Sequence, residues 1–263
     1  MPDGPRTRAT LATDLAALGL RASDVVLVHS SLSKLGWVCG GAVAVVQALL
    51  DVLGPLGTLV VPTQTMDNSD PRHWSNPPVP ESWWPVIREA MPGFDPRVTP
   101  STGIGAIGEM VRRWPGAVRS NHPHASFAAV GARAPELMAE HRLDSHLGER
   151  SPLAALERAD ARVLLLGVGF ESCTAFHLAE YRVPSPRTEF GCAVLTETGD
   201  RKWITYEDVA TNSDDFAALG ADFLRSGAVI RGRIGEADAH LFEFANAVEH
   251  AVRWLPDNRP QAN

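Results

Sequence analysis

The hydrophobic residues of the chain form short unbroken runs, separated by longer stretches with helical spacing. The runs consist largely of valine and leucine and are typical of strands buried on both faces of a sheet. They occupy residues 24–29, 57–62 and 162–169. Between the first two runs, a loop and a helix-patterned stretch over 41–53 complete a βαβ unit of ordinary size. The pattern therefore predicts parallel strands at the centre of a sheet.

Helical spacing recurs along the rest of the chain, and Gly19 and Gly54-Pro55 mark the ends of the first two helices. We expect helices over residues 7–18, 41–53, 82–91, about 103–113, 133–141, about 174–181, 214–225 and 236–254. Further strands are expected at 126–130 and 227–234, and the segments 190–197 and 201–206 form a hairpin around Thr198-Gly199-Asp200. The sequence predicts one α/β domain over residues 1–263. Its mixed, largely parallel central sheet is flanked by helices and carries a small antiparallel hairpin.

The composition narrows the class of protein. The 263 residues are 44% hydrophobic and 21% charged, values of a globular protein that exclude disorder, collagen and coiled coil. With 24 Lys and Arg against 31 Asp and Glu, the formal net charge of −7 attracts neither nucleic acid nor an anionic membrane. Three cysteines without a C-x-x-C pair indicate neither a disulfide framework nor a zinc site. Because no signal peptide or membrane-spanning run is recognisable, we expect a cytoplasmic protein. As a separate expectation, the protein is either a monomer or a homodimer.

A loop rich in serine and glycine follows the first buried run. It extends from His29 to Gly41 and leads into the helix predicted over 41–53. Ligands of open α/β sheets bind at the carboxyl ends of the strands, and a helix N-terminus offers unpaired N–H groups to a phosphate. The loop therefore favours a phosphate or pyrophosphate site. The alternative is a serine-rich turn that only caps the helix.

Residues 103–108, Gly-Ile-Gly-Ala-Ile-Gly, match the glycine pattern of dinucleotide-binding sites. The match follows Pro100-Ser101-Thr102 and not a predicted strand, and no acidic residue closes a second strand at the right distance. We interpret this segment as a tight helix start that can touch a ligand.

The third buried run leads into a candidate catalytic site. Thr174, His177 and Glu180 follow it at intervals of three, which places them on one face of a helix at the ligand-binding edge. Histidine titrates near neutral pH and suits a general base, and a neighbouring carboxylate can fix its tautomer. The alternative is a histidine satisfied within the core beside a surface glutamate, but the position after a strand favours catalysis.

Other histidines and acidic residues carry weaker signals. His122, His124, His141 and His146 contain an H-x-H pair, but without a third ligand at a telling spacing we expect solvated loop histidines and no metal. A cluster of acidic residues after the hairpin, together with two in the loop after residue 63, could bind a polycation. We favour the interpretation that they form a solvated face and that the helix beginning at Asp214 is capped there. These residues are Glu207, Asp208, Asp214 and Asp215, together with Asp67 and Asp70.

Taken in order, several segments make the chain resemble the aminoglycoside 3-N-acetyltransferase family. They are His29–Ser33 with Leu35-Gly36, Gly40-Gly41, Gly57–Thr63, His122-Pro123, Ser126–Ala129 with Gly131, Ser151–Leu153, Leu164–Gly169, and Thr174 with His177–Glu180. The segments run in family order through nearly the whole chain. The resemblance implies a distinctive α/β fold and an enzyme that transfers acetyl from acetyl-CoA to the 3-amino group of an aminoglycoside antibiotic, and so confers resistance.

The resemblance also assigns roles to residues. His177 matches the catalytic histidine of the family and Glu180 the acidic residue beside it. Acetyl-CoA would be bound by His29, Ser30, Ser31, Leu32, Ser33, Leu35, Gly36, Val38, Gly40 and Gly41, with Thr102 and Gly103 at the pantetheine arm. His29 is in addition an active-site candidate. The ammonium groups of the substrate would meet Asp67, Glu171 and Asp214.

These roles give a mechanism in which His177 takes a proton from the substrate amine while the amine attacks the thioester, and Thr174 donates a hydrogen bond to the oxyanion. A route through acetylated Cys173 stays formally open. Three other functions also remain: an acyltransferase for a non-antibiotic amine, a non-catalytic CoA-binding protein, and an oxidoreductase that binds a dinucleotide at residues 103–108.

Overall fold

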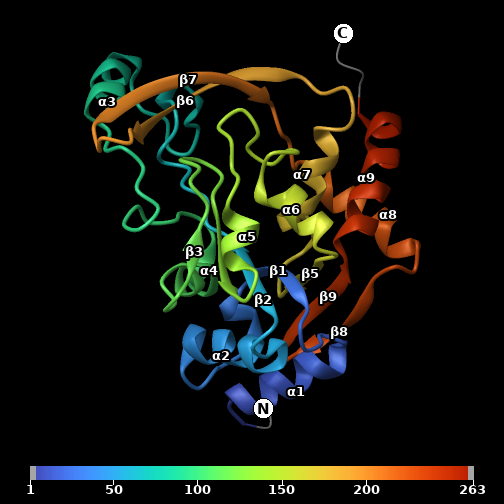
Figure 1. Cartoon of the computed structure of the whole chain (residues 1–263). Helices are drawn as coiled ribbons and strands as arrows, with labels where there is room; N and C mark the ends of the chain where they lie inside the picture. Colours follow the sequence, from blue (N-terminus) through green and yellow to red (C-terminus); the bar gives the residue numbers. More distant parts are fainter. Residues whose placement is uncertain (1–3, 260–263) are drawn as a thin grey trace.

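The computed structural model describes residues 4–259, and its centre is a mixed sheet with helices on both faces (Figure 1). Within these residues the sheet has seven strands in the order β3-β4-β2-β1-β5-β9-β8. The strands are β1 Val25–Ser30, β2 Thr58–Pro62, β3 Val118–Arg119, β4 Phe127–Gly131, β5 Arg162–Leu166, β8 Ile230–Ile234 and β9 Ala237–Glu243. Strand β1 pairs in parallel with β2 and β5, and the outer pairings are antiparallel. The predicted α/β domain with a mixed sheet is confirmed, and its parallel part consists of the three central strands.

Alternate side chains of the central strands enter two separate cores. Val26 and Val28 of β1 pack with α1, α2 and α4, whereas Val25 and Leu27 pack on the opposite face with α5 to α9. The helices are α1 Arg8–Leu18, α2 Gly41–Leu53, α4 Gly105–Arg112, α5 Ala134–Met138, α6 Pro152–Arg158, α7 Ala175–Glu180, α8 Phe216–Arg225 and α9 Phe244–Asn258. No helix in the described part of the chain has both the length and the apolar character needed to cross a bilayer.

A long hairpin extends from the body of the domain across its upper end in Figure 1, toward helix α3 (Trp84–Ala90). Its strands, β6 Arg187–Leu195 and β7 Arg201–Val209, are longer than predicted and pair with each other along their whole length. Asn68 fastens the hairpin to the body, because its side-chain amide both donates to and accepts from the backbone of Ala193 at 3.2 Å. The predicted hairpin is therefore confirmed as a two-stranded sheet of its own.

The helix predicted over 236–254 is wrong in its first part. Residues Ala237–Glu243 form strand β9, which lies between β5 and β8, and only Phe244 onward is helical. The side chains of Ala237, Ala239 and Leu241 are buried in one core and that of Asp238 is exposed, because successive side chains of a strand point to opposite faces of the sheet. Alanine, leucine and glutamate favour helices locally, but pairing with two neighbouring strands overrides that preference.

Candidate functional site

The candidate site is a cavity of about 560 Å³ at the carboxyl ends of β1, β2 and β5. These three strands run in parallel, so their ends meet at one edge of the sheet, where open α/β folds bind ligands. The cavity walls come from the end of β1 with Ser31–Ser33, the end of β2, the start of α4, and the segment Glu171–His177. The structure therefore brings together the serine loop, the glycine segment and the candidate catalytic helix.

His177 lies at the cavity wall on α7, and Thr174 is the N-cap residue of that helix. Nδ1 of His177 lies 2.6 Å from Oε2 of Glu180, one helical turn later, so the Nδ1–H group donates a hydrogen bond to the carboxylate. The histidine side chain is 13% exposed, and its ring centroid lies 4.7 Å from that of the buried Phe216. This arrangement fixes the tautomer that leaves Nε2 without a proton and free to act as a base.

The carboxylate of Glu180 is almost completely buried, with 1% of its side chain exposed. While Oε2 binds His177, Oε1 accepts the backbone N–H of Asn212 at 2.9 Å and a hydrogen bond from Arg259. Arg259 in turn donates from Nε and Nη2 to the two carboxylate oxygens of Asp215, each at 2.6 Å. These hydrogen bonds with Arg259 hold the pKa of Asp215 below its usual range.

Arg259 and Asn212 belong to no recognisable motif, and the chain brings them to Glu180 only on folding. Asp215 was expected in a solvated acidic cluster, but it is partly buried and paired with Arg259. The helix N-cap predicted at Asp214 is also wrong, since α8 begins at Phe216 and its N-cap residue is Asp215, without a side-chain cap.

His29 lies behind Thr174 at the end of β1, and a hydrogen bond of 3.2 Å joins its Nε2 to Oγ1 of Thr174. Burial, together with the charge of His177, lowers the pKa of His29 to about 3. The imidazole of His29 therefore stays neutral at physiological pH and can hold the Thr174 hydroxyl without competing for protons.

The opposite side of the cavity suits an anion. Gly103 and Gly105 have positive φ values of 74° and 76°, which allow the sharp turn into α4. The first N–H groups of α4 have no partner within the helix, and the wall residues Gly103–Ala106 carry no bulky side chain except Ile104. The hydroxyls of Ser31 and Ser33 lie 3.1 Å apart on the facing loop. The glycine segment is thus a tight helix start beside a ligand cavity, preceded by a loop and not by a strand.

Several residues predicted to bind acetyl-CoA do not line this cavity. Leu35 and Val38 are buried in the core beneath the loop, and Gly36 packs against the side chain of Glu236. Gly40 and Gly41 form the N-terminus of α2. The helix N-terminus among the residues that line the cavity is that of α4, whereas the predicted phosphate site at the start of α2 lies outside this lining and stays a prediction. His29 and Ser30–Ser33 do line it, and their predicted contact with acetyl-CoA stays a prediction.

Of the further predicted binding residues in loops near the cavity, some line it and others do not. Thr102 does not line it, but its hydroxyl accepts the backbone N–H of Met66 at 3.0 Å and so joins the loop after β2 to α4. Among the three predicted acidic contacts, Glu171 lines the cavity, and one of its carboxylate oxygens accepts the N–H of Gly169 at 2.9 Å. Asp67 and Asp214 are exposed and outside the lining.

Cys173 lies next to Thr174 in sequence but points into the core. Its side chain is completely buried, and burial raises the pKa of the thiol to about 12. The reactive form of cysteine is the thiolate, which is scarce at such a pKa. The geometry therefore favours direct transfer over a route through an acetylated cysteine.

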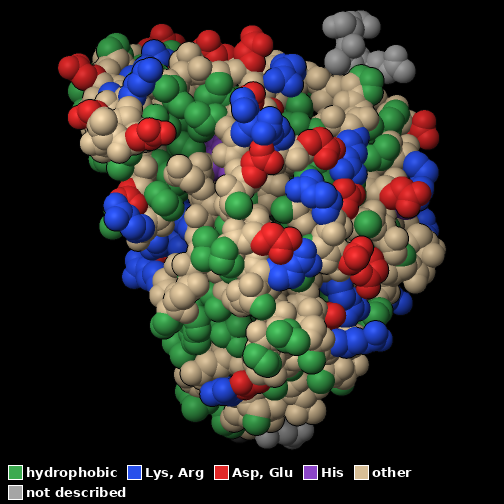
Figure 2. All heavy atoms as spheres, in the orientation of Figure 1, with side chains coloured by type: hydrophobic (Ala, Val, Ile, Leu, Met, Phe, Trp, Pro, Cys, Tyr) green, Lys and Arg blue, Asp and Glu red, His purple; other side chains and the backbone are tan. Residues whose placement is uncertain are grey.

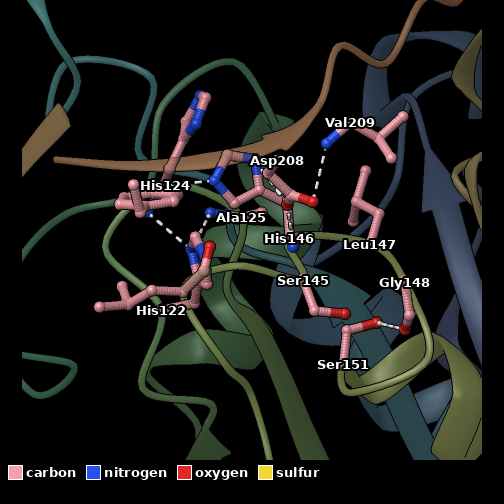
Figure 3. A network of polar contacts seen from close by, with 12 residues as sticks. His122, His124, Ala125, Ser145, His146, Leu147, Gly148, Ser151, Asp208 and Val209 are labelled. Carbon is pink, nitrogen blue, oxygen red and sulfur yellow. Dashed lines mark hydrogen bonds and ion pairs between the residues drawn. The ribbon is translucent and has the colours of Figure 1, made fainter. Parts of the chain in front are cut away.

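The prediction of solvated histidines at 122, 124, 141 and 146 is wrong, because the fold collects the four rings in one cluster. Figure 3 shows three of them, His122, His124 and His146. His122 and His146 are buried, and Nδ1 of His122 accepts the backbone N–H groups of His124 and Ala125. Desolvation lowers the pKa of His124 and of His141 to about 4. In the described residues, 4–259, no three His, Cys, Asp or Glu side chains are arranged to hold a metal ion.

The prediction that Asp208 lies on a solvated face is also wrong. Its carboxylate is fully buried and accepts the N–H of His146 at 2.7 Å and the N–H of Val209 at 2.8 Å (Figure 3). It also accepts the hydroxyl of Tyr181 at 2.7 Å. Tyr181 directly follows α7, so this network joins the candidate catalytic helix to strand β7 of the hairpin.

The surface agrees with the charge of the sequence. On the face drawn in Figure 2, basic and acidic side chains are interspersed, and no broad basic area is visible. A cavity at the edge of an α/β sheet that holds a helix start and a histidine–glutamate pair has the parts that a group-transfer enzyme needs, namely an anion site and a base.

Comparison with known proteins identifies the family. The sequence pattern described as "Aminoglycoside 3-N-acetyltransferase" matches residues 27–256. The SPbeta prophage-derived aminoglycoside N(3')-acetyltransferase-like protein YokD of Bacillus subtilis (strain 168) is 45% identical over 255 residues, 97% of this chain and 94% of that protein. Aminoglycoside N(3)-acetyltransferase IX of Micromonospora chalcea is 37% identical and covers 96% of this chain and 94% of its own. The chain therefore belongs to the aminoglycoside 3-N-acetyltransferase family and is an acyltransferase of that family.

Solved structures support the same assignment. The crystal structure of YokD matches with a TM-score of 0.93 and covers 97% of this chain and 100% of its own. A structure described as AAC-IIIb binary with CoASH matches with a TM-score of 0.86 at 33% identity, covering 99% of this chain and 100% of its own. AAC-VIa bound to sisomicin matches with a TM-score of 0.86 at 30% identity, covering 97% and 99%.

Proposed function

We propose that this protein transfers the acetyl group of acetyl-CoA to the 3-amino group of aminoglycoside antibiotics, with His177 as general base. The observation that carries the proposal is the His177–Glu180 pair in the cavity, with Nδ1 of the ring 2.6 Å from the carboxylate. Membership of the family supports the reaction class, and the relatives with bound CoASH and sisomicin support the two substrates.

The cavity fits the phosphate end of CoA. The unpaired N–H groups at the start of α4 and the hydroxyls of Ser31 and Ser33 are donors, and the helix dipole adds positive potential there. A side chain at Gly103 would extend into open space, so the backbone at that position is accessible to a ligand. A thioester bound with its phosphates at α4 would extend along the wall that carries His177.

In the proposed step, the nitrogen of the substrate amine attacks the acetyl carbonyl carbon, and its proton passes to Nε2 of His177. Collapse of the tetrahedral intermediate breaks the carbon–sulfur bond, and the CoA thiolate can take the proton back from the imidazole. Glu180 stabilises the imidazolium that forms between these steps. General-base catalysis of this kind contributes about 10²–10⁴-fold to the rate.

Thr174 is placed to stabilise the oxyanion. Its hydroxyl lies at the cavity wall and is partnered by the neutral His29, so it can turn a hydrogen bond toward the developing negative charge. A backbone N–H group near Thr174 is a second candidate donor. Neither donor needs a thiolate at Cys173, which is consistent with direct transfer.

One observation favours a second candidate, an acyltransferase for a different amine. An aminoglycoside carries several ammonium groups, yet Glu171 is the single carboxylate among the residues that line the cavity in the described chain. YokD, moreover, is described as aminoglycoside N(3')-acetyltransferase-like. For aminoglycosides, Asp67 and Asp214 at the surface would have to supply the further contacts from outside the cavity.

Free-thiol release from acetyl-CoA, measured with a panel of aminoglycosides, tests the proposal. Thiol release with a 2-deoxystreptamine aminoglycoside, and a product that NMR identifies as acetylated at the 3-amino group, is the expected result. Streptomycin is the control, since its central ring carries guanidino groups in place of amines. CoA binding by calorimetry without release for any aminoglycoside would reject the antibiotic as substrate and leave the second candidate.

A further inference from the structure

Arg259 is the residue at the C-terminal end of α9, on a part of the chain that is distant in sequence from the catalytic helix. All three of its guanidinium nitrogens are engaged. Nε and Nη2 bind Asp215, Nη1 binds Glu180, and Nη2 also donates to the backbone carbonyl of Asn212 at 2.6 Å. The planar fork of arginine suits this pattern, which a lysine ammonium cannot reproduce.

The electrostatic situation of Glu180 explains why such a partner is needed. A carboxylate with 1% of its side chain exposed has lost nearly all of its hydration, which is costly unless a cation and hydrogen bonds compensate. A general base must have a free nitrogen lone pair before it takes a proton, so in its proposed role His177 cannot also supply that cation. Arg259 is the cation bound to Glu180. Arg259 and His177 lie near the same aromatic ring, since the guanidinium carbon lies 5.9 Å and the His177 ring centroid 4.7 Å from the centroid of Phe216.

We propose that Arg259 is a positioning residue of the catalytic site. It holds the Glu180 carboxylate in the orientation that fixes the His177 ring, and its positive charge compensates the buried negative charge of Glu180 beside that ring. The inference rests on the proposed role of His177 as the base. Asp215 belongs to the same arrangement, because it binds two nitrogens of Arg259 and so fixes where the guanidinium lies.

The charged and titratable groups near His177 come from five elements and together determine its protonation. Glu180 lies on the same helix, His29 at the end of β1 and Glu171 on the turn before α7, while Asp215 precedes α8 and Arg259 follows α9. Removing the cation and removing the anion of the Arg259–Asp215 pair must therefore shift the titration of His177 in opposite directions. A purely structural role for the pair predicts no such reversal.

The test compares R259Q, R259K and D215N in the full-length protein. R259Q removes a positive charge, so the titration of the His177 ring, followed by imidazole NMR and assigned by its loss in H177N, moves to higher pH. D215N removes a negative charge and moves it to lower pH, and R259K keeps the charge and stays near the wild type. Since displacement of a reacting group by about 1 Å can cost about 10²-fold, we expect kcat to fall 10- to 100-fold in R259Q with little change in the KM for acetyl-CoA.

R253Q is the matched control, because Arg253 lies on the same helix and its exposed pair with Glu249 is remote from the site. It should leave the titration and kcat unchanged. A titration that does not move in R259Q and D215N, in proteins whose circular dichroism matches the wild type, overturns the inference. The NMR readout needs no acceptor, so the expected shifts in a protein that acetylates no aminoglycoside would support Arg259 while rejecting the proposed substrate.

Discussion

Replacing Asp208 by alanine should destabilise the protein strongly. The substitution leaves two backbone N–H groups, those of His146 and Val209, and the hydroxyl of Tyr181 without their acceptor in a fully buried position. Each unsatisfied buried group costs about 1–3 kcal/mol, so the loss in the free energy of unfolding is about 3–5 kcal/mol if water partly compensates. Burial and the nearby Asp208 carboxylate raise the pKa of Tyr181, so its phenol remains a donor throughout the neutral range.

Thermal unfolding followed by far-UV circular dichroism measures this loss. For a chain of this size each 1 kcal/mol shifts the midpoint by about 2–4 °C, so D208A should unfold at least about 6 °C below the wild type. D208N keeps one acceptor oxygen and should fall between the two. Glu207 is exposed on the same strand, and E207A should change the midpoint by less than about 2 °C. A D208A midpoint within about 2 °C of the wild type would refute the reasoning, because the network would then contribute under 1 kcal/mol.

Three further predictions concern the cavity and the histidine cluster. T174V should lower kcat by about 10²-fold in steady-state assays while T174S retains most of it, since one oxyanion donor is lost; equal kcat in both variants contradicts this role. A106D places a negative charge at the start of α4 and should weaken CoA binding about tenfold by calorimetry, whereas unchanged affinity would place the phosphates elsewhere. His124 and His141, with pKa values lowered by burial to about 4, bind protons in the unfolded chain at a higher pH than in the folded one. Stability is therefore complete above pH 6.5 and lost toward pH 4, by about 1.4 kcal/mol per pH unit for each histidine, and equal thermal midpoints at neutral pH and about pH 5 would contradict this.

The parts of the fold that the sequence predicted well carry local signals. The helix over 41–53 is found as Gly41–Leu53, because helical spacing and Gly54-Pro55 fix both its face and its end. Strand β9 was missed because its residues favour a helix locally, and only the neighbours β5 and β8 make it a strand. Helix α6 was also missed, although Ser151 with Pro152 is a recognisable helix start.

In the candidate site too, residues with a local sequence pattern were predicted, and residues brought together only by folding were not. Thr174, His177 and Glu180 share one short helix, so their spacing alone placed them together. Arg259 and Asn212 reach Glu180 from other elements and carry no local pattern. The four clustered histidines were expected in solvent for the same reason, because the burial of a loop residue depends on which distant segment covers it.

The measurement that tests the account most directly is turnover by H177A beside its affinity for CoA. The account predicts a kcat about 10²–10⁴-fold below the wild type, with CoA affinity unchanged, because His177 supplies the base and not the binding site for the phosphates. An H177A protein that binds CoA normally and retains full turnover would show that another group takes the proton.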